Sequence, residues 1–547
     1  MADIILINPR FSPSYWGLNY AMPLLDAKAA VAPINLPLLA ALTPPEHTVT
    51  LLDENIEEID FDRCSRADIV GITGMNVQRK RMHEILVELR RRDVFVVLGG
   101  PWVTVCPDDF GSLPSAIFIG EAEQTWPRFL AEWGEGRHQS RYEQLDKTEL
   151  TTVPPPRLDL LPMGKYAYGS VQISRGCPFT CEFCDIIVVF GRRPRIKTAA
   201  QVIAELEGLL AAGKRNAFIV DDNLIGNKKA IKPILREIIV WQEDNGYPLS
   251  FATEASIDLA EDEELMQLMV AANIDTVFVG IESPNEAALR ETKKIQNLAD
   301  QRGTMLEKVY RIQAAGMEVW SGMIVGFDND DESVFSAQRQ FIQKARIAMA
   351  MVNVLVAIPR TPLFTRLQKE GRLDESGEMS NFGTINTNVI PLKIGRRALC
   401  DGYLDLMHDL YTPEAYFSRV DALYLDGELR PASGRVRYFR HRPWRRLRLN
   451  LWAAVEGVFV FFQLMRLVPD AGLRREYRRR LWNVVKRRPL IDLLRQYCVN
   501  CAMHYHCYRL VQQMRADRAA LEVEIDDSSR ESGSNALAGP SLNTAGV

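Results

Sequence analysis

The first residues, M-A-D-I-I-L-I-N-P, lack a basic stretch and contain only a short apolar run, so no secretory leader is expected. No charge of one sign dominates, since the formal net charge is −4, and this excludes a global attraction to nucleic acid or membrane. Cysteine is sparse, with nine residues among 547. The sequence therefore predicts a cytosolic protein whose thiols stay reduced, and whose clustered cysteines serve a metal or catalysis rather than disulfides.

Length and composition indicate several globular domains. The hydrophobic share of 47% and the charged share of 25% are ordinary, and the chain is too long for one core. A proline-rich connector, T-T-V-P-P-P-R, marks a boundary near residue 151. We expect a Rossmann-like domain (1–150), a linker (151–167), a partial barrel (168–367), a mostly α-helical domain (368–515) and a disordered tail (516–547).

Up to about residue 130, short apolar runs alternate with helical patterns. Strands are expected at 3–8, 47–53, 67–73, 94–100 and 116–121. This alternation predicts a parallel α/β sheet, whose ligands bind at the carboxyl ends of the strands. The dinucleotide fingerprint G-x-G-x-x-G is absent after the first strand. Glycines at these strand ends therefore indicate either tight turns alone or a close approach of another ligand.

A second α/β series follows. Its six strands are expected at 170–176, 216–222, 249–256, 276–283, 318–327 and 351–359. Six β/α units fall short of the eight of a complete barrel, which predicts a partial (β/α)6 TIM-like barrel. Polar residues gather at the carboxyl ends of its strands, the edge that carries the chemistry in such barrels.

Three cysteines lie within eight positions directly after the first barrel strand, in G-C-P-F-T-C-E-F-C. They are Cys177, Cys181 and Cys184, at spacing C-x3-C-x2-C. A closed zinc site takes four ligands, whereas three thiolates on a [4Fe–4S] cluster leave one iron open. The spacing favours the cluster over two alternatives, a zinc loop with a distant fourth ligand and buried cysteines without function.

Over roughly residues 168–367 the chain resembles the radical S-adenosylmethionine (SAM) superfamily. The resemblance rests on the cysteine motif, on Phe183 before the last cysteine and on the six β/α units. It implies a cluster whose open iron binds SAM, and reductive cleavage of SAM to a 5′-deoxyadenosyl radical. It further implies SAM contacts from Phe183, Asp221, Asp222, Asn223, Glu254, Ser256 and Glu282. The Asp-Asp-Asn run departs from the Gly-Gly-Glu form common there, and each polar residue could instead cap a helix or form an ion pair.

A Rossmann-like domain before such a barrel resembles the cobalamin-binding radical SAM class. The supporting runs are D-I-V-G-I-T (68–73), G-G-P-W-V-T (99–104) and G-E-A-E (120–123). The resemblance implies a corrin over the carboxyl ends of the strands. The cobalamin contacts that it implies are Thr73, Gly74, Met75, Gly99, Gly100, Trp102, Gly120 and Glu121. The alternative is a Rossmann domain that binds nothing and serves packing.

Two absences refine this resemblance. No D-x-H-x-x-G motif occurs in the first domain, so no histidine is expected below the cobalt, and Trp102 or Met75 is expected to shield that face. The methylthiotransferase branch carries a second cysteine trio in this domain, but here only Cys64 and Cys106 are present. That argues against a second cluster.

The C-terminal region is arginine-rich and contains a twenty-residue apolar run at 449–468. The run includes Glu456 and Gln463, and arginines flank it on both sides. It predicts an interfacial helix at an anionic membrane surface rather than a membrane span. The alternative is a core helix with basic edges. No RNA-binding module is evident.

A second cysteine and histidine cluster, C-V-N-C-A-M-H-Y-H-C, occupies residues 498–507. On a helix these side chains would not converge on one metal ion. A helix with mixed faces is favoured, and the alternatives are a second metal or an acid/base role for His504 or His506.

The order of segments over residues 1–515 resembles the bacterial group that contains the hopanoid C-2 methylases. The resemblance implies a C-methyltransferase acting on an unactivated sp3 carbon of a polycyclic lipid, with a [4Fe–4S] cluster, SAM and cobalamin as cofactors. The implied partners are a flavodoxin or ferredoxin as electron donor and the inner face of the cytoplasmic membrane, without nucleic acid. The alternatives are a radical rearrangement, a cyclisation, methylation of another substrate, and a non-catalytic cobalamin or redox sensor.

Overall fold

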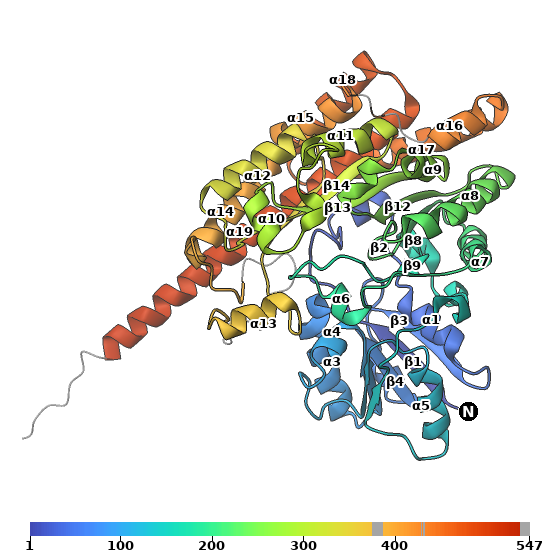
Figure 1. Cartoon of the computed structure of the whole chain (residues 1–547), viewed down its shortest axis with the longest axis vertical. Coiled ribbons are helices and arrows are strands. Elements are labelled where there is room, and N and C mark those ends of the chain that lie inside the picture. Colours follow the sequence, from blue (N-terminus) through green and yellow to red (C-terminus); the bar gives the residue numbers. More distant parts are fainter. Residues whose placement is uncertain (375–386, 428, 430–432, 536–547) are drawn as a thin grey trace, which may run out of the picture.

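The structure is a computed structural model that describes residues 1–374, 387–427, 429 and 433–535. Figure 1 shows a lower lobe built from the N-terminal sheet, an upper lobe built from the barrel, and helices of the C-terminal region packed along the upper lobe. The α/β architecture and the helical C-terminal region agree with the prediction.

The N-terminal sheet has six parallel strands in the order β3-β1-β4-β5-β6-β7. Its strands are β1 (Asp3–Asn8), β3 (Thr48–Asp53), β4 (Ile69–Thr73), β5 (Val96–Gly99), β6 (Ala116–Ile119) and β7 (Arg141–Glu143). Its helices are α1 (Asn35–Leu42), α2 (Phe61–Cys64), α3 (Arg79–Arg91), α4 (Pro101–Val105) and α5 (Thr125–Gly134). Every residue of β4 is buried, as expected for a parallel strand that helices cover on both faces.

The barrel sheet is also parallel, in the order β15-β14-β13-β12-β11-β8-β2. Its strands are β2 (Ala29–Val31), β8 (Tyr166–Val171), β11 (Asn216–Ile219), β12 (Ser250–Glu254), β13 (Ile274–Glu282), β14 (Glu318–Val325) and β15 (Ala350–Val354). The helices that follow its strands are α7 (Ala199–Ala211), α8 (Lys228–Asp244), α9 (Glu263–Ala271), α10 (Glu286–Glu291), α11 (Met305–Ala315), α12 (Ser333–Lys344) and α13 (Pro362–Lys369). The six expected strands are present, and β2 adds an unexpected seventh.

The segment that carries β2 departs from the predicted domain boundary. Although it lies within residues 1–150, β2 pairs with β8 of the barrel. Just before it, the Tyr15 hydroxyl lies 3.4 Å from that of Tyr403, and the backbone N–H of Tyr20 donates to His506 Nδ1 at 3.2 Å. The N-terminal chain therefore leaves its own sheet, extends the barrel and contacts the C-terminal helices before it returns.

The C-terminal region is mostly helical from residue 396 onward. It contains α14 (Arg396–Leu410), α15 (Pro413–Tyr424), α16 (Ser433–Phe439), α17 (Pro443–Leu467), α18 (Ala471–Arg487) and α19 (Ile491–Asn535). The last helix continues beyond residue 515, where we expected the disordered tail to begin, and the tail residues 536–547 lie outside the described part of the chain. Helices α17 and α19 pack together and against the turn Met22–Leu25 before β2.

The cysteine and histidine cluster at 498–507 lies on α19, as the favoured interpretation predicted. His504 and His506 are fully buried, and each uses both ring nitrogens. The Tyr477 hydroxyl lies 2.8 Å from His504 Nδ1, and His504 Nε2 lies 3.2 Å from the Tyr411 carbonyl. Because a carbonyl only accepts, Nε2 carries the proton and Nδ1 accepts. By the same argument Nε2 of His506 carries the proton, since it faces the Ser14 carbonyl.

These neutral histidines predict an acid-labile contact between α19 and the N-terminal segment. Burial lowers the pKa of His504 to about 3 and that of His506 to about 4. Below pH ~6.5 these histidines are protonated in the unfolded chain but stay neutral in the folded chain. The free energy of unfolding therefore falls as pH falls, by ~1.4 kcal/mol per histidine and pH unit. His506→Gln should therefore lose less stability than the wild type between pH 7 and pH 5 in denaturant unfolding. Equal losses would show that His506 is not held neutral.

Candidate active site

The cysteine loop begins where the short strand β9 (Ser174–Arg175) ends and runs to the helical turn α6 (Ile186–Val189). Gly176 opens it with φ +95°, and a Cβ there would lie 2.9 Å from the Gly191 carbonyl oxygen, so only glycine fits. Cys181 is buried, whereas Cys177 and Cys184 are half-buried. The loop thus presents three thiols on one short segment at the carboxyl edge of the barrel.

Polar donors face two of these sulfur atoms. Asn223 Nδ2 donates to Cys177 Sγ at 3.9 Å, and Gln296 Nε2 donates to Cys181 Sγ at 3.6 Å. Burial raises the pKa of the Cys177 and Cys184 thiols, so their deprotonation needs positive charge nearby. Within the described residues, no three His, Cys, Asp or Glu side chains are already grouped as a metal site. Three thiols with amide donors aimed at them nevertheless match the ligands that a [4Fe–4S] cluster takes.

Lys294 supplies the nearby positive charge. It forms an ion pair with Glu282 at 2.8 Å, and its ammonium lies 5.9 Å from the centre of the Phe183 ring. Burial opposes its charge, but the Glu282 carboxylate and the Cys181 thiol raise the pKa of Lys294 above its usual value. The sequence analysis missed both Lys294 and Gln296. They lie directly after α10, in the run T-K-K-I-Q-N (292–297), which matches no motif.

The residues after β11 hold the cysteine loop in place. Asp221 accepts from the backbone N–H groups of Ile173 and Ser174 at 2.8 and 2.7 Å, and from the Ser174 hydroxyl at 2.7 Å. Asp222 accepts from the Gly176 N–H at 2.7 Å. Burial raises the pKa of Asp221 to about 7 and that of Asp222 to about 6. Asp221 thus anchors β9, and Asp222 anchors the glycine before the first cysteine.

Replacing Asp221 by Ala should destabilise the protein by roughly 2–4 kcal/mol, because two buried N–H groups and one hydroxyl lose their acceptor. Iron incorporation should fall with it, since the loop loses its anchor. Thermal unfolding and iron analysis check both effects. Asp221→Asn is the matched control, because the amide keeps one acceptor oxygen at the same position. An Ala variant as stable as the wild type would contradict this role.

The remaining predicted SAM contacts surround the same edge of the barrel. Glu254 ends β12, and burial, with the charges of Asp222 and Asp221 next, raises its pKa to about 8. The Ser256 hydroxyl and Asn223 hydrogen-bond at 3.1 Å. Glu282 ends β13 at φ +64°, a backbone conformation rare for residues other than glycine. The structure thus brings all the predicted polar residues to one edge, beside the cysteine loop.

Aromatic residues lie together on one face of the barrel sheet. Phe278 of β13 lies opposite Trp320 of β14, and both are half-buried between fully buried neighbours. The Trp16 ring, from the N-terminal segment, lies 4.7 Å from that of Phe278. Glu282 ends the same strand after a register shift that follows Gly280. The strand that carries Glu282 to the polar rim therefore also carries part of an apolar patch.

The carboxyl edge of the N-terminal sheet contains the predicted cobalamin contacts. Thr73 and Gly99 are neighbours on β4 and β5. Gly100 has φ +101°, and a Cβ there would lie 2.6 Å from Thr73 Oγ1. A Cβ on Gly120 would lie 2.6 Å from the Gln144 carbonyl oxygen. These two glycines are therefore required by contacts within the protein itself, whatever ligand binds above them.

Met75 and Trp102 differ in exposure. Trp102 is buried, and its indole N–H donates to Asp109 at 2.8 Å, whereas 45% of Met75 is exposed. Of the two, Met75 is thus the one placed to cover a ligand. Next to it, Asn76 Oδ1 is buried without a hydrogen-bond partner among the described residues. An unpaired acceptor beside an exposed apolar side chain fits a large ligand with amide donors, such as cobalamin.

Glu121, which follows β6, connects the N-terminal sheet to the small sheet of β9 and β10 (Arg195–Ile196), the two strands that flank the cysteine loop. It accepts two bonds from Arg195 of β10, at 2.6 and 2.8 Å, and one from the Thr148 N–H. Arg175, which precedes the cysteine loop, pairs with Glu123 at 2.7 Å. All four charged side chains are at least nine-tenths buried. This network fixes the cysteine loop relative to the N-terminal sheet, a role that the sequence did not indicate for Glu121.

Two family matches cover most of the barrel and the helical region. Residues 171–337 match the Radical SAM superfamily, and residues 361–520 match a domain of unknown function, DUF4070. An uncharacterized methyltransferase of Synechocystis sp. is 39% identical over 418 residues, which are 76% of this chain and 77% of that protein. The hopanoid C-2 methylase of Rhodopseudomonas palustris is 33% identical over 497 residues, 89% of each chain.

A solved structure has the same overall arrangement. The cobalamin-dependent S-adenosylmethionine radical enzyme OxsB, with aqua-cobalamin and S-adenosylmethionine bound, superposes with a TM-score of 0.59. The match covers 94% of this chain and 80% of OxsB at 15% sequence identity. The fold is therefore shared from the N-terminal sheet to the C-terminal helices.

Proposed function

Because the chain belongs to the cobalamin-dependent radical SAM methyltransferases, we propose that it methylates an unactivated sp3 carbon of a polycyclic lipid, a hopanoid at C-2. The family assignment makes the protein an enzyme and makes a [4Fe–4S] cluster, SAM and cobalamin its cofactors. The hopanoid substrate is supported by the similarity to the Rhodopseudomonas palustris methylase. The class of substrate is supported by the surface of α17.

The proposed roles follow the geometry of the site. Cys177, Cys181 and Cys184 would hold the cluster, and Asn223 and Gln296 would donate to its sulfur ligands. When bound, the three cofactors supply a carbon radical on the substrate and a methyl group to trap it. The contribution of the chain is to orient these groups and to exclude water. Glu254, Glu282, Ser256 and Phe183 remain the proposed SAM contacts, and Met75 with the glycines of the N-terminal sheet the proposed cobalamin contacts.

An exposed apolar stripe along α17 carries the lipid proposal. The helix is long and apolar enough to cross a membrane by length and composition, yet only 24% of its most apolar window is buried in the protein. Large apolar side chains repeat every three or four residues on its exposed face, at Trp444, Leu447, Leu451, Val455, Val458 and Phe462. The opposite face packs inward through Ala453, Val460 and Leu464. One stripe of a helix is therefore left facing outward.

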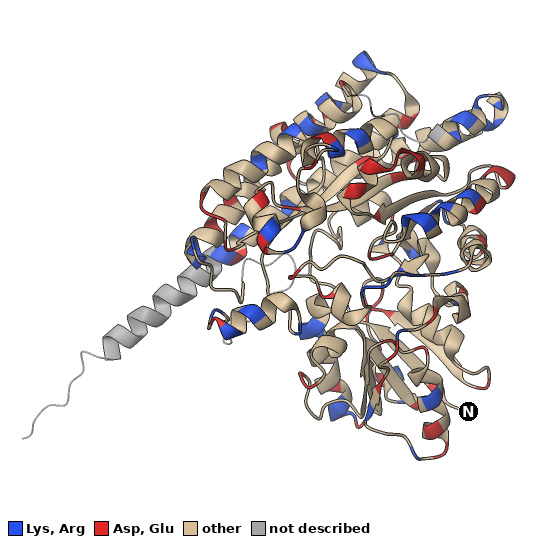
Figure 2. Cartoon of the chain, in the orientation of Figure 1, with Lys and Arg blue, Asp and Glu red and all other residues tan. Residues whose placement is uncertain are grey.

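Exposed arginines accompany the stripe in this region of the chain. Arg445 and Arg446 lie on α17 itself, and Arg475, Arg478 and Arg479 lie on α18, the next helix in the sequence, which packs on α19. Figure 2 shows the basic residues along the C-terminal helices. An exposed apolar stripe on a helix that also carries exposed arginines is typical of a helix that lies in the interface of an anionic membrane. Since α17 also packs on the turn before β2, the helix that carries the stripe lies close to the edge strand of the barrel sheet.

Lipid analysis of the native host tests the proposal. Cells with and without the gene are fed methyl-deuterated methionine, and their polycyclic lipids are compared by mass spectrometry. Loss of one labelled methyl group from a hopanoid in the deletion strain, restored by the wild-type gene, is the expected result. Identical hopanoids in both strains under conditions where the protein is expressed would reject the hopanoid substrate.

A further inference from the structure

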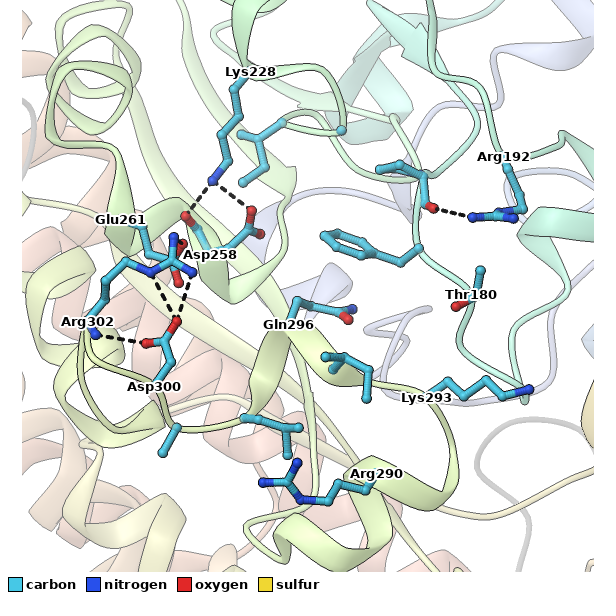
Figure 3. Close-up of a pocket in the computed structure, with 17 residues that line it drawn as sticks. Thr180, Arg192, Lys228, Asp258, Glu261, Arg290, Lys293, Gln296, Asp300 and Arg302 are labelled. Atoms are coloured by element: carbon cyan, nitrogen blue, oxygen red, sulfur yellow. Dashed lines mark hydrogen bonds and ion pairs between the residues drawn. The ribbon is translucent and has the colours of Figure 1, made fainter.

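The loops around the cysteines enclose a hollow of about 830 Å³ that the proposed methylation does not use. Pro178, Phe179 and Thr180 of the cysteine loop form one side, and the loops after β11, β12 and β13 form the rest (Figure 3). We propose that this hollow is the docking site of an acidic one-electron carrier protein that reduces the cluster. The inference rests on the proposed function in one respect, because it needs the cluster on the three cysteines.

The floor of the hollow is immediately next to the proposed cluster ligands. Pro178, Phe179 and Thr180 are the three residues between Cys177 and Cys181. Gln296 also lines the hollow, and the same side chain donates to Cys181 Sγ at 3.6 Å. A carrier seated here would be separated from a cluster ligand by a single layer of side chains. Electrons would therefore enter without crossing the barrel, where SAM and substrate are proposed to bind.

The charges that reach solvent around the hollow are predominantly positive. The side chains of Arg290 and Arg302 are 60% and 61% exposed. The acidic residues of the lining are less exposed than these two arginines, since Glu261 is 8%, Asp258 19% and Asp300 34% exposed. Figure 3 shows Arg302 and Lys228 reaching over these carboxylates. An approaching protein therefore meets cations first, even though most of them have an acidic neighbour.

Cations also flank the cysteine loop on its other side. Arg192 is exposed and donates to the Pro178 carbonyl at 3.5 Å, and Arg193 beside it is exposed as well. Lys293 lies on the opposite rim, paired with Glu182 of the cysteine loop at 2.9 Å. Basic residues on two sides of a shallow hollow complement an acidic protein surface and speed its encounter. A macromolecular carrier suits this spread of charge better than a small ligand, which would contact only one rim.

The electron balance is simple. One electron passes from the reduced carrier to the oxidised cluster, so the carrier is oxidised by one electron and the cluster is reduced by one. No bond forms or breaks and no proton moves in this step. The carrier is the only co-reactant, and a flavin or iron–sulfur carrier supplies the electron.

The test compares two reductants of different size on the iron-loaded enzyme. In the variant Arg192→Glu/Arg290→Glu, one cation is reversed on each rim and the cysteines are untouched. Reduction of the cluster is followed anaerobically by its absorbance, with photoreduced flavodoxin or with dithionite. At low salt the second-order rate with flavodoxin should fall at least tenfold, while the rate with dithionite stays within twofold. Added salt should slow the wild type toward the variant.

Arg91→Glu is the matched control, because Arg91 is an exposed, ion-paired arginine on α3 of the other lobe. It should leave both rates unchanged. An unchanged flavodoxin rate in the double variant, or equal losses with both reductants at full iron content, would overturn the docking site. The assay needs no lipid, so a failure of the hopanoid proposal would leave its outcome unaffected.

Discussion

Replacement of Cys181 by Ala is expected to abolish SAM cleavage while the protein still folds. A [4Fe–4S] cluster held by three protein thiolates has one iron without a ligand from the chain. Loss of the Cys181 thiolate leaves two such irons. Iron content should therefore fall from about four per chain to near zero, and 5′-deoxyadenosine formation should fall to background. Stability should change by only ~1 kcal/mol, since a small side chain in a loop is shortened.

Anaerobic reconstitution, iron analysis and chromatographic detection of 5′-deoxyadenosine check this prediction. Cys106→Ala is the matched control, because Cys106 is a partly buried cysteine of the N-terminal domain outside the motif. It should retain full iron and full cleavage. SAM cleavage by an iron-free Cys181→Ala protein would reject the cluster assignment. If circular dichroism shows that Cys181→Ala does not fold, Cys184→Ala is tested in its place, and the same loss of iron and SAM cleavage is expected.

Local sequence was enough to predict the polar edge of the barrel. The cysteine spacing and the acidic strand ends were readable because their positions follow from one strand and the turn after it. The parallel arrangement then brings separate strand ends together at one edge. By contrast, Lys294 and Gln296 approach the cysteine sulfur atoms only because of the backbone conformation of the segment after α10, in which Lys293 has φ +57°. No residue pattern encodes that conformation.

Long-range pairing explains the other surprises of the fold. Strand β2 is only the three residues A-A-V, too short for a period to be recognised, and it forms because the edge of β8 needs a partner. The contact between Ser14 and His506 joins residues 492 positions apart. Likewise, the sequence left open whether the glycines serve tight turns or the approach of a ligand, and contacts with Thr73 and Gln144 already require Gly100 and Gly120. Such constraints exist only after the chain has folded.

Membrane binding is where we expect the second large effect. The triple variant Leu451→Ser/Val455→Ser/Phe462→Ser removes three large side chains from the exposed stripe of α17. If each contributes roughly 1 kcal/mol by partial insertion among lipid chains, affinity for vesicles should fall by a factor of about 10². Binding to vesicles of mixed anionic and zwitterionic phospholipid, measured by sedimentation, checks this. The fold should be unaffected, because none of the three side chains packs in the core.

The control is a second triple variant, Val87→Ser/Leu145→Ser/Val240→Ser, which removes three exposed apolar side chains from other surfaces. If apolar exposure alone drove binding, both variants would lose affinity equally, and the stripe would have no special role. If α17 is the docking face, only the first variant loses affinity. The residual binding of that variant should then be the part most sensitive to salt, since it depends on the arginines of α17 and α18. Unchanged binding by the α17 variant would remove the main structural support for a lipid substrate.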